Sequence, residues 1–338
     1  MAGSVTVTAR TSMVEAARVA AGVHIVPLMP ADQVVALAVE AERLGYDYCL
    51  LADEGFHPDI YACLGVIARE TDRITIGAMT NGYTRHPAVT AAALATVNEL
   101  SGGRAMVTVL AGGSMVLAPM GIERARPFRV VSDTVEILRR LWSGQPVTWA
   151  GTKYGLDAAQ LAMGAQDIPI WLAGRGPLIL GLAGRSADGA LLTVKPDLAA
   201  ALGIVDESAA TSQRRPKRIY LGRICYTPEM LQDQRVTLSF VLMDSPRRVL
   251  QSLGLDEPAV DTVQRASREN RPDLVAPLVT DDLLRRYQVA GSPAECTDEV
   301  RRLVGTHALD AILVDVLSTD HAENLALMRD TLPIISGG

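Results

Sequence analysis

The chain has 338 residues, of which 49% are apolar and 21% charged, and its formal net charge is −6. Because the charge is acidic and dispersed, the chain lacks the basic surface that attracts nucleic acids or anionic membranes, and we expect neither as a partner. No apolar stretch approaches the length of a membrane span, and no basic start with an apolar block and a small-residue cleavage site opens the sequence. These features predict a soluble cytoplasmic protein.

The four cysteines, Cys49, Cys63, Cys225 and Cys296, show no CxxC spacing and lie among apolar or helix-forming residues. This favours buried free thiols over a disulfide or a metal site, and no metal is expected.

Apolar runs typical of buried strands alternate with helical segments along most of the chain. Residues 1–21 differ from this pattern and are interpreted as an N-terminal appendage, with Ser12 and Glu15 at capping-box spacing before a short helix. The expected strands are residues 22–28, 46–51, 74–78, 105–110, 170–173, 190–194, 217–226 and 311–317. The expected helices between them include residues 30–44, 59–70, 88–100, 127–142 and 177–186.

Residues 227–310, mostly helical in pattern, are too long for one crossover between the last two strands. We therefore expect a helical insertion there as well as a seventh helix. Eight strands alternating with helices favour an α/β fold of the closed (β/α)8 TIM-barrel type over an open doubly wound sheet. The sequence thus predicts one barrel domain over residues 22–338.

The run RITIGAMTNGYTRHP, from Arg73 to Pro87, contains a strand, a polar turn and the start of a helix. The next strand, residues 105–110, leads into Ala111-Gly112-Gly113. Two glycine-rich tips therefore follow neighbouring parallel strands, at the sheet edge where α/β proteins bind ligands.

Gly174-Arg175-Gly176-Pro177 follows the fifth strand and opens a helix. Free amides at such a helix start attract a phosphate or carboxylate, and Arg175 could add a charge-assisted bond, although an ordinary tight turn explains the pattern equally well. The segment loosely resembles a dinucleotide-binding GxGxxG. However, Gly181 lies five positions after Gly176 instead of three, and four strand–helix units precede the motif.

Asp53 and Glu54 follow the second strand, and we expect only one of these carboxylates to enter the barrel mouth while the other caps the next helix. His24, within the first strand, is either a core residue or a mouth residue, and His86 before Pro87 is typical of a helix cap. No GxSxG, HExxH, P-loop or Ser/His/Asp order appears, which argues against hydrolases, zinc proteases and P-loop kinases.

With these motifs in place, the chain resembles the luciferase-like flavin and deazaflavin oxidoreductases, and within them the coenzyme F420-dependent methylenetetrahydromethanopterin reductases. The matching residues are spread over about residues 22–335 and are specific only together. They are Val26-Pro27 with Pro30, Ala52-Asp53, Thr80-Asn81 with Tyr83 and Arg85 to Pro87, Leu100 to Arg104, Gly176-Pro177, Ser186 to Ala190, and Ala290 to Glu295.

The resemblance implies a (β/α)8 barrel, homodimers, and a deazaflavin at the C-terminal mouth. It also implies a non-prolyl cis peptide at Ala78-Met79, in a bulge that supports the flat ring from behind. By the same matching, Thr80, Asn81, Gly112, Gly113 and Ser114 would line the ring and its side chain. Gly174, Arg175, Gly176 and Pro177, with Thr193, would receive the phosphate-bearing tail.

Three departures concern the substrate side. Where the reductases usually have Asn-Pro, this chain has Asn81-Gly82, and where they have Asp-His, it has Asp53-Glu54. An acidic residue of their first strand is His24 here. This predicts the same cofactor class with a different small-molecule substrate.

The predicted reaction is hydride transfer between F420 and an unsaturated or carbonyl-type carbon. Glu54 is the first candidate proton donor or acceptor, because partial burial would raise its pKa, and His24 and Asp53 follow. The alternatives are an FMN-dependent monooxygenase of the same fold and a cofactor-binding protein without catalysis.

Overall fold

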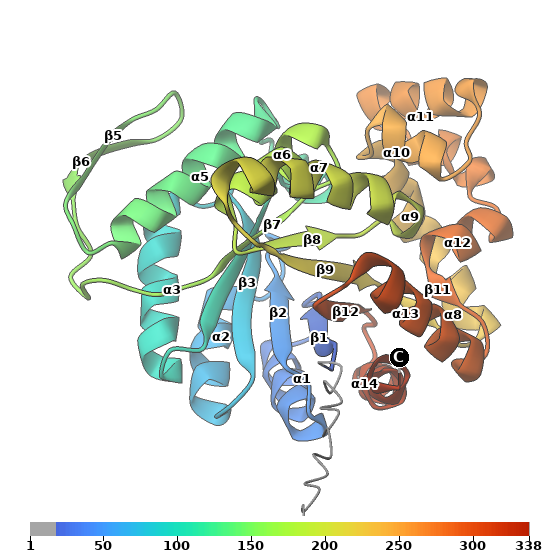
Figure 1. Ribbon diagram of the computed structural model, residues 1–338, viewed down its shortest axis with the longest axis horizontal. Helices are drawn as coiled ribbons and strands as arrows, with labels where there is room; N and C mark the ends of the chain where they lie inside the picture. Colours follow the sequence, from blue (N-terminus) through green and yellow to red (C-terminus); the bar gives the residue numbers. More distant parts are fainter. Residues whose placement is uncertain (1–17, 338) are drawn as a thin grey trace, which may run out of the picture.

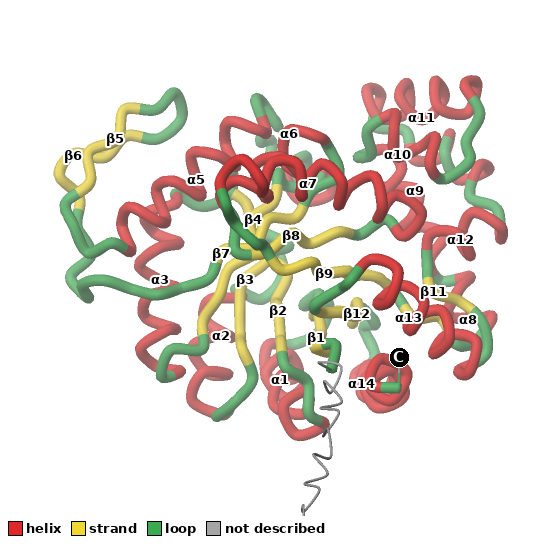
Figure 2. The backbone as a smooth tube through the Cα atoms, in the orientation of Figure 1, coloured by secondary structure: helices red, strands yellow, loops and turns green. Residues whose placement is uncertain are grey.

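The computed structural model describes residues 18–337, and its centre is a closed barrel of eight parallel strands (Figures 1 and 2). The strands are β1 (Ala20–Ile25), β2 (Tyr48–Ala52), β3 (Thr75–Asn81), β4 (Ala105–Leu110), β7 (Ile170–Ala173), β8 (Gly189–Leu192), β9 (Lys217–Gly222) and β12 (Ala311–Val316). Their order around the barrel is β1-β12-β9-β8-β7-β4-β3-β2, and β1 pairs with β2 to close it. The predicted (β/α)8 fold is confirmed.

Helices surround the barrel, as Figure 2 shows. They are α1 (Ala31–Leu44), α2 (Ile60–Glu70), α3 (Pro87–Ser101), α5 (Pro127–Trp142), α6 (Pro177–Ser186), α7 (Leu198–Ser212), α13 (Pro293–His307) and α14 (His321–Ser336). The expected capping box at Ser12 and Glu15 lies outside the described residues. A capping box does start α13, where Ser292 and Glu295 bond each other's backbone amides.

Two apolar cores follow from strand alternation. Leu50, Met106, Ile219 and Leu313 point into the barrel and fill it. Residues of the opposite parity, such as Ala78, pack between the strands and the helices. All four cysteines are buried and free, and burial raises the pKa of the Cys49 thiol to about 12, which keeps that thiol protonated.

The predicted cis peptide and bulge at Ala78-Met79 are wrong. The described residues contain no cis peptide bond, and β3 pairs with β4 residue by residue from Ile76 to Asn81. A bulge needs an extra residue on one strand, and neither ladder of β3 has one. Gly77 permits this close pairing, because a Cβ there would lie 2.8 Å from the backbone oxygen of Met106.

Two further segments differ from the expected strands. The strand expected over residues 217–226 is broken, because β9 ends at Gly222 and Ile224–Cys225 leaves the barrel as β10 to pair with β11 (Val289–Ala290). Residues 143–164, where no strand is among those expected, contain an antiparallel hairpin of β5 (Val147–Ala150) and β6 (Gly155–Ala159), which projects from the barrel in Figure 2.

The insertion after β10 has a core of its own. Its helices are α8 (Pro228–Gln232), α9 (Gln234–Met243), α10 (Arg247–Ser252), α11 (Glu257–Glu269) and α12 (Asp281–Tyr287). They bury Leu242, Leu250, Val260 and Leu284 among themselves. Figure 1 shows this body beyond the carboxyl ends of β8 and β9, so the insertion lies at the mouth where a ligand site is expected.

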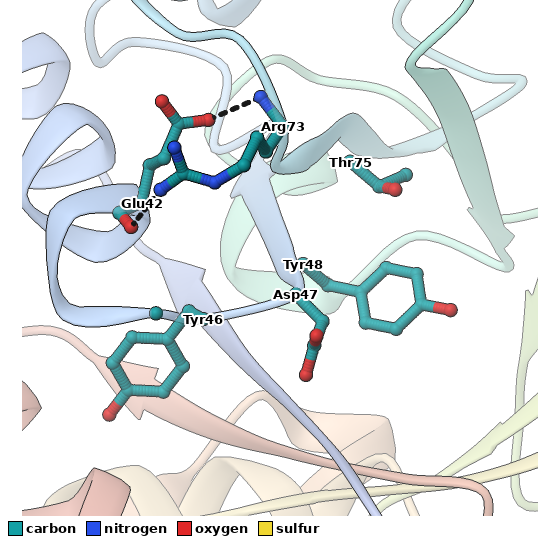
Figure 3. A pocket seen from close by; sticks show the side chains of 7 residues that line it. Glu42, Tyr46, Asp47, Tyr48, Arg73 and Thr75 are labelled. Carbon is teal, nitrogen blue, oxygen red and sulfur yellow. Dashed lines mark hydrogen bonds between the residues drawn. The ribbon is translucent and has the colours of Figure 1, made fainter.

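A polar pocket lies at the opposite, amino-terminal end of β2 and β3 (Figure 3). One of its lining residues is Glu42, whose carboxylate accepts bonds from the backbone amides of Asp72, Arg73 and Ile74 at 2.6 to 3.1 Å. Burial raises the pKa of Glu42, but the three amide bonds outweigh it and hold the pKa below its usual value. This end of a TIM barrel serves stability, and Glu42 fixes the α2–β3 turn.

Replacing Glu42 by Gln is therefore expected to lower the free energy of unfolding by about 1 to 2 kcal/mol, since an amide has one acceptor oxygen without charge. Because the carboxyl pKa is lowered in the folded state, its contribution is present at neutral pH and is lost as the pH falls below about 4. Urea unfolding at pH 7 and pH 3.5 tests this. The exposed Glu207→Gln variant is the control, and an equal loss at both pH values would contradict the prediction.

Candidate active site

A cavity of about 290 Å³ opens at the carboxyl ends of the barrel strands. Its floor and walls come from strand ends and the turns after them, and α9 of the insertion forms its roof. The lining residues from the barrel are His24, Ala52, Asp53, Glu54, Met79, Thr80, Asn81, Leu110, Gly113, Met115, Val116, Arg175, Thr193, Leu221 and Asp315. The lining residues from the insertion are Gln234, Thr237, Leu238, Phe240, Val241, Asp244, Tyr287 and Gln288.

His24 and Asp315 form a buried pair across the closure of the barrel. They are register partners in β1 and β12, and His24 Nδ1 lies 2.8 Å from Asp315 Oδ1. The His24 side chain is only 9% exposed, and its Nε2 has no partner among the described residues. His24 is thus held in place through one nitrogen while the other is left for a ligand. Sequence reasoning missed Asp315, although a lone carboxylate in the apolar strand AILVDV was an available signal.

Asp53 and Glu54 both line the cavity, so the expectation that one of them caps the next helix is wrong. Asp59 caps α2 instead, accepting from the amides of Tyr61 and Ala62. Asp53 accepts a 2.7 Å bond from the hydroxyl of Thr80 on the neighbouring strand. Its carboxylate is therefore tied to the end of β3.

The electrostatic surroundings of Glu54 favour its protonated form. Burial is the largest influence and raises the pKa of the Glu54 carboxyl, and the nearby carboxylates of Asp53 and Asp315 add to this. His24 and His57 act in the opposite direction without cancelling the effect. A carboxyl group with a raised pKa can donate a proton nearer neutral pH than an ordinary glutamate.

Arg175 and Thr193 lie together on the other side of the cavity. Arg175 Nε donates to Thr193 Oγ1 at 3.2 Å, and its Nη1 donates to the carbonyl of Val241 on α9 at 3.2 Å. The Arg175 carbonyl in turn accepts from Arg248, which is paired with the buried Asp197. Arg175 is thus the one guanidinium among the described residues that line the cavity.

Other predicted cofactor residues lie next to the cavity without lining it. Gly176 is the N-cap of α6, Pro177 is its first residue, and Gly174 packs closely against Ile179. Gly112 has φ +74°, a conformation that favours glycine, and leads into Gly113.

Ser114 and Ala78 also depart from the predicted arrangement. The amide and hydroxyl of Ser114 both contact a carboxylate oxygen of Asp244 at 3.3 Å. Ala78 faces the outer core and not the mouth. At the tip of β3, Asn81 Oδ1 accepts from the amides of Tyr83 and Thr84, and His86 caps α3 as expected, its Nδ1 accepting from Ala88.

The cavity suits a flat ring with an anionic tail. Met79, Leu110 and Leu221 supply apolar contact, Gly113 allows close approach, and Arg175 with the start of α6 supplies positive potential. Over residues 18–337, no cluster of His, Cys, Asp or Glu could hold a metal ion, and no helix is long and apolar enough to cross a membrane.

Residues 2–309 match the family described as luciferase-like monooxygenase. The chain belongs to this family. The prediction of a luciferase-like oxidoreductase is thereby confirmed.

The chain is also similar to individual proteins, among them two relatives and one solved structure. The chain is 28% identical to 5,10-methylenetetrahydromethanopterin reductase of Methanolobus tindarius, over 84% of this chain and 90% of that protein. It is 26% identical to F420-dependent glucose-6-phosphate dehydrogenase of Intrasporangium calvum, over 88% and 93%. Its fold matches the coenzyme F420-dependent tetrahydromethanopterin reductase of Methanopyrus kandleri with a TM-score of 0.79 and 23% identity, over 94% and 99%.

The His24–Asp315 pair makes a prediction about the tautomer of His24. An ionised carboxylate only accepts hydrogen bonds, so neutral His24 should carry its proton on Nδ1. Long-range ¹H–¹⁵N NMR at alkaline pH should show this tautomer, and Asp315→Leu should shift the population toward the Nε2–H form. His86 is an internal control, because its Nδ1 accepts a bond and its proton must lie on Nε2. An Nε2–H tautomer for His24 in the unmodified protein would contradict the prediction.

Proposed function

We propose that this luciferase-like protein is an F420-dependent oxidoreductase, which transfers a hydride between the deazaflavin and an unsaturated or carbonyl-type carbon of a small organic substrate. The observation that carries the proposal is the division of one cavity into two sides. His24, Asp53 and Glu54 belong to β1 and the end of β2, and Arg175 and Thr193 follow β7 and β8, which lie across the barrel from those strands. The F420-dependent glucose-6-phosphate dehydrogenase named above supports the choice of cofactor.

In this proposal Thr80, Asn81 and Gly113 would hold the ring, with Met79 and Leu110 as apolar contacts. The start of α6, from Gly174 to Pro177, would hold the phosphate of the tail with Arg175 and Thr193. Arg175 must then exchange its bond to the Val241 carbonyl for one to the phosphate. Gly112 and Ser114 belong to the ring side, and Ser114 must release Asp244 to take part.

F420, when bound, supplies the carbon that gives or accepts the hydride. The protein supplies the proton and the orientation. Glu54, whose pKa is raised by burial, donates a proton to the substrate in the reducing direction and accepts one in the oxidising direction. His24, oriented by Asp315, accepts a hydrogen bond through Nε2 from a hydroxyl group at the reacting carbon. Asp53 is engaged by Thr80, and α9 limits the access of water.

A first prediction concerns F420 and its tail. Purified protein should bind F420 in a fluorescence titration, and more tightly than the same deazaflavin riboside without phosphate. Arg175→Gln should weaken F420 binding about 10- to 100-fold, the range of a charge-assisted hydrogen bond, and leave the riboside unaffected. Arg185→Gln, on the exposed side of α6, is the control.

Absence of F420 binding would contradict the proposed function. Tight FMN binding together with oxygen consumption during turnover would favour the FMN-dependent monooxygenase of the same fold.

A second prediction concerns Glu54. Glu54→Gln should lower kcat about 10²- to 10⁴-fold in the reducing direction, because the amide cannot transfer a proton, while the Kd for F420 stays unchanged. In the unmodified enzyme the reducing rate should fall as the pH rises through the raised pKa of Glu54, since the protonated form is the donor. Glu207→Gln is the control. Unchanged turnover and an unchanged pH profile in Glu54→Gln would exclude this role.

A further inference from the structure

Two buried glutamines connect the end of β9 to the roof of the cavity. The backbone amide of Arg223 donates to Gln288 Oε1 at 2.9 Å, and Gln288 Nε2 donates to Gln234 Oε1 at 3.3 Å. Gln234 and Gln288 are 2% and 4% exposed, and both line the cavity. Gln234 Nε2 is buried and has no partner among the described residues. The chain of bonds therefore ends in a free donor at the cavity.

The direction of these bonds follows from chemistry. A backbone N–H can only donate, so the group of Gln288 that faces Arg223 must be its oxygen. The NH₂ of Gln288 then faces Gln234, so the group of Gln234 that accepts this bond must be its side-chain oxygen. This leaves the NH₂ of Gln234 as the group without a partner, and a buried donor without a partner costs stability until a ligand satisfies it.

Both glutamines are held by their backbones as well as by each other. Gln234 is the first residue of α9, and the Gln288 carbonyl accepts a bond from Lys195, which also contacts the Arg285 carbonyl and Glu299. A donor positioned in this way loses little freedom when it binds a ligand, which suits a residue that selects substrates.

The charges around the cavity narrow the class of ligand. Among the described residues, four carboxyl groups line it, those of Asp53, Glu54, Asp244 and Asp315, against the single guanidinium of Arg175. An anionic substrate would be repelled by these carboxyl groups when they are ionised. An uncharged oxygen can accept a hydrogen bond from an amide without this repulsion.

We propose that Gln234 is a specificity-determining residue, whose side-chain amide donates a hydrogen bond to an uncharged carbonyl or hydroxyl oxygen of the substrate. Gln288 is a positioning residue that keeps the amide in the donating orientation. The inference rests on the proposed function, because it places the substrate between the deazaflavin and α9.

The test uses two probes of the same shape. Cyclohexanone has an acceptor oxygen, and methylenecyclohexane has a CH₂ group in its place. NMR titration of the F420-loaded protein should give a Kd about three- to tenfold lower for the ketone, the contribution of one neutral hydrogen bond. The ketone should also shift the side-chain amide resonance of Gln234, and cyclohexanecarboxylate should bind more weakly than the ketone.

Gln234→Met removes the amide at similar length and should abolish the preference for the ketone, without changing the Kd for F420. Gln288→Met leaves Gln234 in place but frees its orientation, and should reduce the preference. If Gln234→Met does not fold, the ketone preference of Gln288→Met tests the proposal in its place. Gln251→Leu, an exposed glutamine of α10 bonded to Glu257, is the control.

Equal binding of the two probes to the unmodified protein, or a preference that survives both Met variants, would overturn the role of Gln234. Failure of F420 binding is measured separately, in the titration without probes, and would count against the proposed function instead.

Discussion

The register between β1 and β12 is the constraint on which the site depends. These two strands lie at opposite ends of the chain, and their pairing closes the barrel and sets His24 beside Asp315. Side chains alternate across a strand, so a slip of one residue would turn one partner toward the outer helices. The same ladder keeps Leu313 in the interior one layer below. The packing of the interior and the polarity of the mouth are therefore fixed by one set of backbone hydrogen bonds.

The insertion, which forms the roof of the cavity, is stabilised by an apolar core separate from that of the barrel. Its helices bury their own apolar residues, and some of its contacts to the mouth are polar. Arg124 pairs with Asp244, and Arg175 contacts the Val241 carbonyl. Polar contacts of this kind can be exchanged for bonds to a ligand at little cost, whereas an apolar contact would be lost on opening. The barrel thus gives a rigid floor, and α9 gives a roof whose contacts a bound cofactor can replace.

Much of the fold could be predicted from local sequence because each barrel unit repeats the same signals. Apolar strands, glycine after the helices, and Pro at the first position of α3, α5 and α6 are all short-range features. The helix α7 was missed, since its sequence is rich in Ala and Leu without a pronounced polar face. The β5–β6 hairpin was missed as well, because its strands are short and half exposed.

The candidate site could be predicted only in the parts that neighbouring residues define. Asp53, Glu54 and Arg175 follow strands and Thr80 lies near the end of one, so position alone places them at the mouth. Asp315 reaches His24 across 291 positions, and Gln288 reaches Gln234 across 54. No local pattern links such pairs, and the role of each residue depends on its partner. The Asp315 carboxylate determines which nitrogen of His24 is free. The backbone amide of Arg223 orients the side-chain amide of Gln288, which in turn orients that of Gln234 toward the ligand. The polarity of the substrate side is therefore a property of tertiary contacts, and substitutions far from one another in the sequence can change it together.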